Sequence, residues 1–213
     1  LVEGGTLEVN GAMAFSGYRY VGKGAGSDGT LIVSGAGAAL SAQSNDYIGT
    51  NGTGRMTVSD GAQVNAWNTK LGDNISGNGM LSVDGIGSVY SYGGRVVVGN
   101  SGQGQITVSG GATVQGQGNG WNIIGWNQGA SGEVLITGAD SKWINNHPFN
   151  RFNLGEYGQG TLTVADGGLF DATDLWIAQY SLLGIDSLGV LDIGAAACDA
   201  ATHPGRAHAS TLP

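Results

Sequence analysis

The residues of this chain that are able to do chemistry are mostly single carboxylates in glycine-rich turns. Glycosidic cleavage needs two carboxylates, or a carboxylate beside Arg or Lys, on one wall. Two pairs qualify for consideration, Asp171 with Asp174 and Asp60 with Asp84 one repeat further on. Asp is also a favoured turn residue, because its side chain bonds its own backbone. We therefore expect these acids to be turn residues and predict that the chain is not an enzyme.

The sequence lacks the residue spacings that are typical of metal and phosphate sites. Calcium-binding repeats place Asp at a nonapeptide period, and the stretches around Asp28 and Asp186 resemble that motif only loosely. The three histidines, His147, His203 and His208, do not have the spacing of zinc ligands. No G-x-x-x-x-G-K-[ST] phosphate loop occurs. The sequence predicts no metal and no cofactor.

Composition excludes several classes of partner. Glycine accounts for 42 of 213 residues, charged residues for only 11%, and the net charge is −8. Nucleic acid and acidic membrane surfaces are therefore poor partners. No apolar run approaches the roughly 18 residues that span a bilayer, so we expect no membrane insertion. The chain begins inside a repeat at Leu1, which leads us to expect a piece of a longer protein.

One short phrase recurs along the chain at a nearly constant interval. It reads GRMTVSDGAQV at 54–64, GQITVSGGATV at 104–114 and GTLTVADGGLF at 160–170. Each copy begins with glycine and an apolar–any–apolar triplet, and the copies follow one another every 24 to 29 residues. Self-similarity at this period indicates a solenoid or a propeller. The opening glycines, whose numbers give these intervals, are Gly5, Gly29, Gly54, Gly79, Gly104, Gly132, Gly160 and Gly189.

Each unit contains three short strand candidates. The triplet is the first, a second follows a Gly/Asp/Ser turn, and the third ends in an apolar–Gly pair such as Ile48-Gly49. Three strands and three turns in about 25 residues predict an all-β parallel β-helix of about eight coils. A propeller blade needs four strands and about 40–45 residues, so a propeller ranks second. Second strands are expected to begin near Val64, Val89, Val114, Trp143 and Phe170.

The turn after the triplet alternates between two sequences. Coils opening at Gly29 and Gly79 continue as SGAGAAL and DGIGSVY, whereas those opening at Gly54 and Gly104 continue as SDGAQV and SGGATV. The alternation predicts a two-coil unit, so that like turns recur about every 10 Å along one edge, twice the coil rise.

Alternation within the triplet turns its two apolar residues inward and its middle residue outward. The middle residues are mostly polar, and we expect Thr57, Ser82, Thr107 and Thr163 to form an outward ladder. Residues 85–92 contain V-Y-S-Y, which permits either register.

A cluster of aromatic residues marks the two longer coils that open at Gly104 and Gly132. The stretch KWINNHPFNRFNLG interrupts the strand pattern, and loops on rigid scaffolds carry function. Aromatic side chains with Asn and Arg suit contact with sugar or protein. The alternative is that Trp143 and Phe152 fill the core or cover a corner. The candidate partner-binding residues are Trp121, Trp126, Trp143, His147, Phe149, Arg151 and Phe152.

The repeat resembles the short repeats of bacterial autotransporter (type V secretion) passenger domains, which also occur in some PEP-CTERM-sorted surface proteins. The unit that carries the resemblance is IGTNGTGRMTVSDGAQV at 48–64, and similar copies cover about residues 1–197. The resemblance implies a right-handed β-helix that is exported through an outer-membrane barrel, absent from this sequence, to the bacterial cell surface or the medium. Members often serve as adhesins, self-association factors or stalks. No catalytic motif accompanies the repeat.

We therefore expect a β-helix domain over residues 1–197, part of a longer passenger, and an irregular tail or linker at 198–213. The expected function is a non-enzymatic, surface-displayed adhesin, self-association or stalk module. Its partner would be a protein or glycan on a host or neighbouring cell, or a second copy. The alternative is a polysaccharide-binding or polysaccharide-cleaving β-helix protein.

Overall fold

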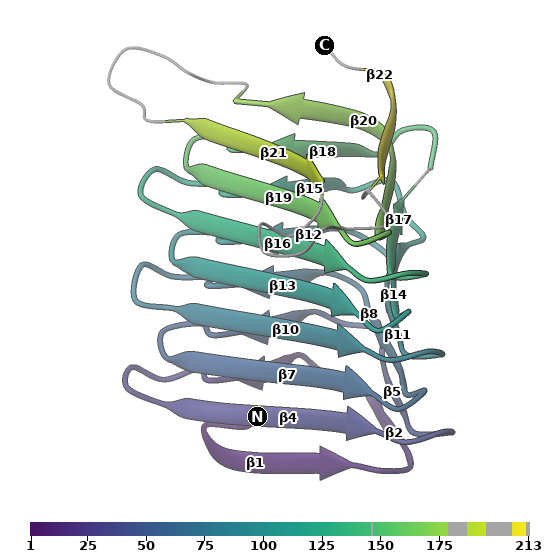
Figure 1. Ribbon diagram of the computed structural model, residues 1–213. Coiled ribbons are helices and arrows are strands. Elements are labelled where there is room, and N and C mark those ends of the chain that lie inside the picture. Colours follow the sequence, from purple (N-terminus) through teal and green to yellow (C-terminus); the bar gives the residue numbers. More distant parts are fainter. Residues whose placement is uncertain (146, 179–186, 195–205, 212–213) are drawn as a thin grey trace.

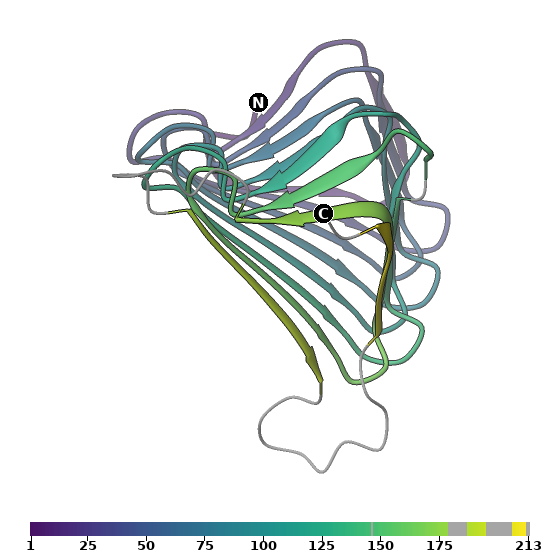
Figure 2. The same cartoon turned by 90° about the horizontal axis from the view of Figure 1, so that it is seen from above.

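The computed structural model describes residues 1–145, 147–178, 187–194 and 206–211. This part of the chain contains strands and no helix, and the strands of successive coils pair in parallel. The chain climbs as a right-handed solenoid with three faces (Figures 1 and 2). The predicted parallel β-helix with three strands per coil is therefore confirmed, with about seven turns in the described residues.

The opening triplets form an eight-stranded sheet, drawn at the front of Figure 1. The opening glycines pair with one another in register, as the repeat predicts: Gly54 lies beside Gly29 on one side and Gly79 on the other. The strands of this sheet are, in order, β1 (Gly4–Val9), β4 (Asp28–Ser34), β7 (Thr53–Ser59), β10 (Asn78–Asp84), β13 (Gln103–Ser109), β16 (Ser131–Thr137), β19 (Gln159–Ala165) and β21 (Leu188–Gly194).

The second and third strands of the coils form the other two faces. The second strands are β2 (Ala12–Phe15), β5 (Ala39–Ala42), β8 (Gln63–Ala66), β11 (Val89–Tyr92), β14 (Thr113–Gly116) and β17 (Lys142–Asn145). The third strands are β3 (Arg19–Val21), β6 (Asp46–Ile48), β9 (Thr69–Leu71), β12 (Val96–Val98), β15 (Trp121–Ile124) and β18 (Arg151–Leu154).

The seventh coil joins these two faces into one sheet. Its strand β20 (Leu169–Ile177) pairs first with β17 and then with β18, so it serves as second and third strand at once. The repeat predicted separate strands starting at Phe170 and ending at Ile177. They merge because Thr173 alone lies between the residues paired with β17 and those paired with β18, which leaves no room for a corner.

The core is a set of apolar columns that run along the solenoid axis. In the six coils from β4 to β19 the inward residues of the triplets, such as Leu81 and Val83, are fully or almost fully buried, whereas Leu7 and Ile193 at the two ends of the stack are partly exposed. The register of β11, which the sequence left open, turns Tyr90 and Tyr92 inward, where each is about 1% exposed or less. Tyr90 lies beside Val64 of the preceding coil and takes its place in that column.

Glycine recurs at the third corner because two backbones meet there. Gly72, which ends an apolar–Gly pair, has φ 62°, a conformation that glycine adopts without strain. A Cβ on Gly72 would lie 2.1 Å from the carbonyl oxygen of Gln103 in the next coil. The opening glycine of a coil contacts an earlier coil in the same way. A Cβ on Gly79 would lie 2.1 Å from the carbonyl oxygen of Ile48. Both glycines of the repeat are thus fixed by coil-to-coil contact.

The predicted two-coil unit is present in the turns after the triplet. One turn places two residues with positive φ next to each other, as at Asp60 and Gly61, and the other separates them by one residue, as at Gly35 and Gly37. The two types alternate from coil to coil along the stack. The further examples are Gly85 and Gly87, Gly110 and Gly111, Gly138 and Asp140, and Asp166 and Gly167.

Part of the expected tail at 198–213 continues the stack. Strand β22 (Arg206–Thr211) pairs in parallel with β20. The rest of that tail, including Cys198, lies outside the described residues. The described part of the chain contains no helix long and apolar enough to span a membrane.

Candidate functional site

The outer face of the eight-stranded sheet carries the predicted ladder. Ser82 lies in register between Thr57 and Thr107, and all three are half-buried. The row then passes through Leu135 before it reaches Thr163. The hydroxyl row is therefore continuous over three coils and is interrupted once.

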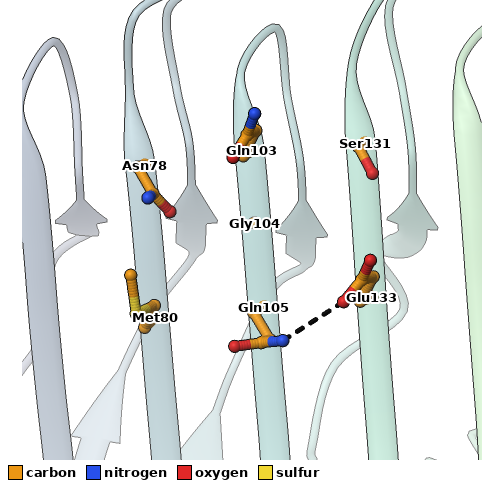
Figure 3. Close-up of a pocket in the computed structure, with 7 residues that line it drawn as sticks. All are labelled: Asn78, Met80, Gln103, Gly104, Gln105, Ser131 and Glu133. Atoms are coloured by element: carbon orange, nitrogen blue, oxygen red, sulfur yellow. Dashed lines mark hydrogen bonds between the residues drawn. The ribbon is translucent and has the colours of Figure 1, made fainter.

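A hollow of about 330 Å³ lies on the same face, beside the third corner. Figure 3 shows its polar side chains on three adjacent strands. Gln105 Nε2 donates a hydrogen bond of 3.1 Å to Glu133 Oε2 in the next coil. The lining residues are Asn78, Met80, Gln103, Gly104, Gln105, Ser131 and Glu133. Amides and hydroxyls thus predominate here as well.

The predicted aromatic set does not form one surface. Trp143 and Phe152 are fully buried and pack edge-to-face, with ring centroids 5.4 Å apart. Phe170 of the next coil packs against Phe152 at 4.8 Å. Trp143 Nε1 also donates to the buried hydroxyl of Tyr92 at 3.0 Å. For these two residues the alternative, core filling, is what the structure shows.

Other members of the set lie outside the core. The Arg151 guanidinium is stacked between Trp121, 3.8 Å from the ring centroid, and Trp176, at 4.2 Å. Such stacking favours a cation over an aromatic ring. Trp126 is half-buried and lies 6.0 Å from the Arg95 guanidinium.

His147 and Phe149 project from the corner between β17 and β18. Their rings are 6.0 Å apart, His147 is half-buried and Phe149 is 75% exposed. The set is thus divided among the core, a stacked outer patch and one corner.

Sequence reasoning missed a groove at the second corner, between the second and third strands. Three adjoining hollows of about 530, 780 and 410 Å³ run across the first coils, and Gln43 lines all three. Trp67 lines two of them and is 56% exposed. We call this the corner groove and define it by Ser16, Gln43, Asn45, Asn65, Trp67, Asn68, Ser91 and Gln117.

A ladder of side-chain amides holds one wall of the corner groove. Asn68 Nδ2 donates to Asn45 Oδ1 at 2.9 Å, and Asn68 Oδ1 accepts from the backbone N–H of Arg95 at 2.9 Å. Asn45 Nδ2 in turn donates to the Tyr47 hydroxyl at 3.3 Å. The wall therefore has its geometry fixed by bonds between three successive coils.

One sequence signal marks this groove. Trp67 stands directly after the second strand, where neighbouring coils have Gln43 and Gly93. A large aromatic residue just outside the strand has no inward position to fill. The repeat pattern describes only the strands and the glycines, so it gave no reason to examine this corner.

The carboxylates of the described residues are largely engaged with neighbours. Asp174, part of one pair considered above, lies opposite Arg151 on the neighbouring strand. No group of three or more possible metal ligands is found among the described residues, and Asp186 and His203 lie outside them. Further contacts of carboxylates include Asp28 with Arg55, Asp73 with Lys70, Asp84 with Ser109, Asp60 with Ser59, and Asp166 with Thr137.

An ion pair lies inside the core of the first coils. Arg19 Nε and Nη2 donate to the two carboxylate oxygens of Asp46 at 2.5 and 2.6 Å. The Tyr90 hydroxyl donates to Asp46 Oδ2 at 2.6 Å and bonds Thr69 Oγ1 at 2.7 Å. Burial raises the pKa of Asp46 above its ordinary value, and the nearby Arg19 charge and these hydrogen bonds oppose that shift.

Comparison of the chain with protein-family models, with curated proteins and with solved structures found no match.

Proposed function

We propose that this chain is a non-enzymatic attachment module, a β-helical rod that makes contacts through its lateral faces. The observation that carries the proposal is the unbroken register of the eight-stranded sheet, from Gly5 beside Gly29 to Gly160 beside Gly189. Register of this kind repeats the same outer rows at the coil spacing of about 4.8 Å. A repeated row suits many weak contacts that add up, rather than one catalytic centre.

The chemistry of the outer face supports contact with a surface. The ladder residues Thr57, Ser82 and Thr107 are uncharged and half-buried, and the neighbouring hollow is lined largely by amides and hydroxyls. A second copy of the rod, or a protein or glycan on another cell, fits such a face. We further propose that the module is displayed at a bacterial cell surface as part of an autotransporter passenger, on the strength of the repeat alone.

Cleavage of a polysaccharide is the weaker alternative. It would need a free acid pair beside a cation. Arg151, which lies opposite Asp174 on the neighbouring strand, is stacked between two indole rings, and five other acids bond to neighbouring side chains. These contacts support a binding role.

Sedimentation velocity over a range of concentrations tests self-association through the ladder. The variant carries Lys at Thr57, Ser82 and Thr107, and the control carries Lys at Ala39, Gln63 and Thr113 on the outward row of the second-strand face. Both variants gain the same charge. We expect the wild type and the control to associate reversibly and the ladder variant to associate at least about tenfold more weakly, because like charges would face each other across the contact.

Equal association of all three proteins would contradict the assignment of the face. Equal weakening of both variants would show a general charge effect instead. A wild type that stays monomeric rejects self-association, and adhesion of beads coated with each protein to cell layers then tests attachment to a foreign surface. Beads that do not adhere would reject the attachment function.

A further inference from the structure

The corner groove is a large hollow surface without charged side chains. Its three hollows are lined by amide, hydroxyl, aromatic and small side chains, and no Asp, Glu, Lys or Arg is among the residues that line them. Nucleic acids and acidic glycans are held mainly by cations, so they do not fit this lining. The occupant that matches the groove is uncharged and rich in hydrogen-bonding groups.

Trp67 forms a fixed aromatic platform in the groove. Its indole occupies the space beside Gly93 of the next coil, where a Cβ would lie 2.7 Å from the ring carbon Cε3. Backbone bonds hold the residue on both sides, from Trp67 N–H to Ser44 O at 2.8 Å and from Gly94 N–H to Trp67 O at 2.6 Å. The packing on Gly93 limits rotation of the ring, so the exposed face of the indole loses little conformational freedom on binding.

Polar groups flank the platform on successive coils. Asn45 and Asn68 are positioned by their mutual hydrogen bond, Gln43 lines every hollow, and Ser91 Oγ accepts from Gln115 Nε2 at 2.9 Å. These groups recur at the coil rise of about 4.8 Å, a step comparable with one sugar unit of an extended glycan chain.

A peptide is a poorer fit than a glycan. Peptides that bind β-folds commonly add a strand to an open sheet edge. Here β5 is already paired with β2 and β8, and β6 with β3 and β9, so the strands beside Gln43 and Asn45 have no free edge. Only β2, the end strand of the sheet, keeps an open edge, at the end of the groove near Ser16. Sugar rings instead present C–H faces to an aromatic ring and hydroxyls to amides, which are the groups the groove contains.

We propose that the corner groove binds a neutral polysaccharide, with one sugar ring stacked on Trp67 and the neighbouring units hydrogen-bonded to Gln43, Asn45 and Asn68. The inference rests on the proposed attachment function and names its partner class. The chain of the ligand runs along the solenoid axis, so longer oligosaccharides bind more tightly than short ones.

The test is isothermal titration calorimetry with defined oligosaccharides. The probes are hexasaccharides of β-1,4-glucose, α-1,4-glucose, β-1,3-glucose, β-1,4-xylose and β-1,4-N-acetylglucosamine, with hexagalacturonate as the acidic control. We expect at least one neutral probe to bind, hexagalacturonate not to bind, and Trp67→Ala to weaken binding by about tenfold or more. Trp176→Ala, which removes a half-buried indole from the third-strand face, is the control and retains the wild-type affinity.

Absence of binding by all five neutral probes at millimolar concentration would overturn the inference. Equal affinity of the Trp67→Ala and Trp176→Ala variants would overturn it too. Thermal unfolding of each variant checks that the fold is kept, and Gln43→Ala provides a second, milder change in the groove. Beads that still adhere to cells although no neutral probe binds would reject this inference and keep the attachment function.

Discussion

Gly72→Ala lowers the free energy of unfolding by about 3 kcal/mol. This loss combines the cost of placing alanine in the left-handed conformation with the cost of a steric overlap. Gly72 has φ 62°, and the new Cβ would lie 2.1 Å from the carbonyl oxygen of Gln103. That oxygen belongs to the backbone of β13, so it cannot move aside as a flexible side chain would. Urea unfolding followed by circular dichroism measures the loss as a lower midpoint at unchanged slope.

Two controls separate the overlap from the backbone conformation. Gly11→Ala adds the same methyl group where no atom lies within 4 Å and the glycine is not left-handed, so its stability should change little. Ala178 occupies the last position of the Gly72 column with φ 51°, and the described residues place no further strand above it. Ala178→Gly should therefore change stability by no more than about 1 kcal/mol. A loss in Gly72→Ala no larger than in Gly11→Ala would contradict the junction as the reason for the repeat.

The sequence predicted the scaffold because the scaffold depends on two simple patterns. The alternation of the triplet decides which residues face inward, and the glycines are needed wherever neighbouring coils touch. Both constraints act on every coil, so each copy repeats the same signal. The sequence did not predict whether Tyr90 and Tyr92 face inward, because each face of V-Y-S-Y carries an apolar residue. The register becomes clear only from the pairing of Tyr90 with Val64.

The candidate sites were less predictable because they lie where the repeat places no demand. The corner groove is built from residues between strands, and its wall depends on contacts such as that between Asn45 and Asn68, which are 23 positions apart. Trp143 and Phe152 were part of a predicted binding set, yet their places in the inward columns beside Val114 and Leu175 make them core residues. Aromatic composition alone did not distinguish the two roles.

The buried ion pair also follows a column that the sequence contains. Arg19 and Asp46 each stand two residues before the apolar–Gly pair residue, at Val21 and Ile48, so period-two alternation turns both inward. A charge in this column requires a partner in the next coil, because an unpaired buried charge costs several kcal/mol. The contact between coils 1 and 2 therefore depends on having Arg19 in one coil and Asp46 in the other.

Arg19→Met consequently lowers the free energy of unfolding by about 3–5 kcal/mol at neutral pH, since it leaves the Asp46 carboxylate buried without a counter-charge. Arg55→Met is the matched control. It breaks a pair with Asp28 that also joins neighbouring coils but lies at the surface, and it should cost less than about 1 kcal/mol. The double variant Arg19→Met, Asp46→Leu should recover most of the loss, because Tyr90 keeps its bond to Thr69.

The pH dependence of the loss identifies its cause. Burial already raises the pKa of Asp46, and removal of Arg19 raises that pKa further. The folded variant then binds a proton that the unfolded chain releases, so its stability falls as pH rises through the raised pKa. The deficit of Arg19→Met relative to wild type should therefore shrink as urea unfolding is repeated from pH 8 down to pH 4. A deficit that is constant over this range, or equal to that of Arg55→Met, would show that Arg19 acts through packing rather than through its charge.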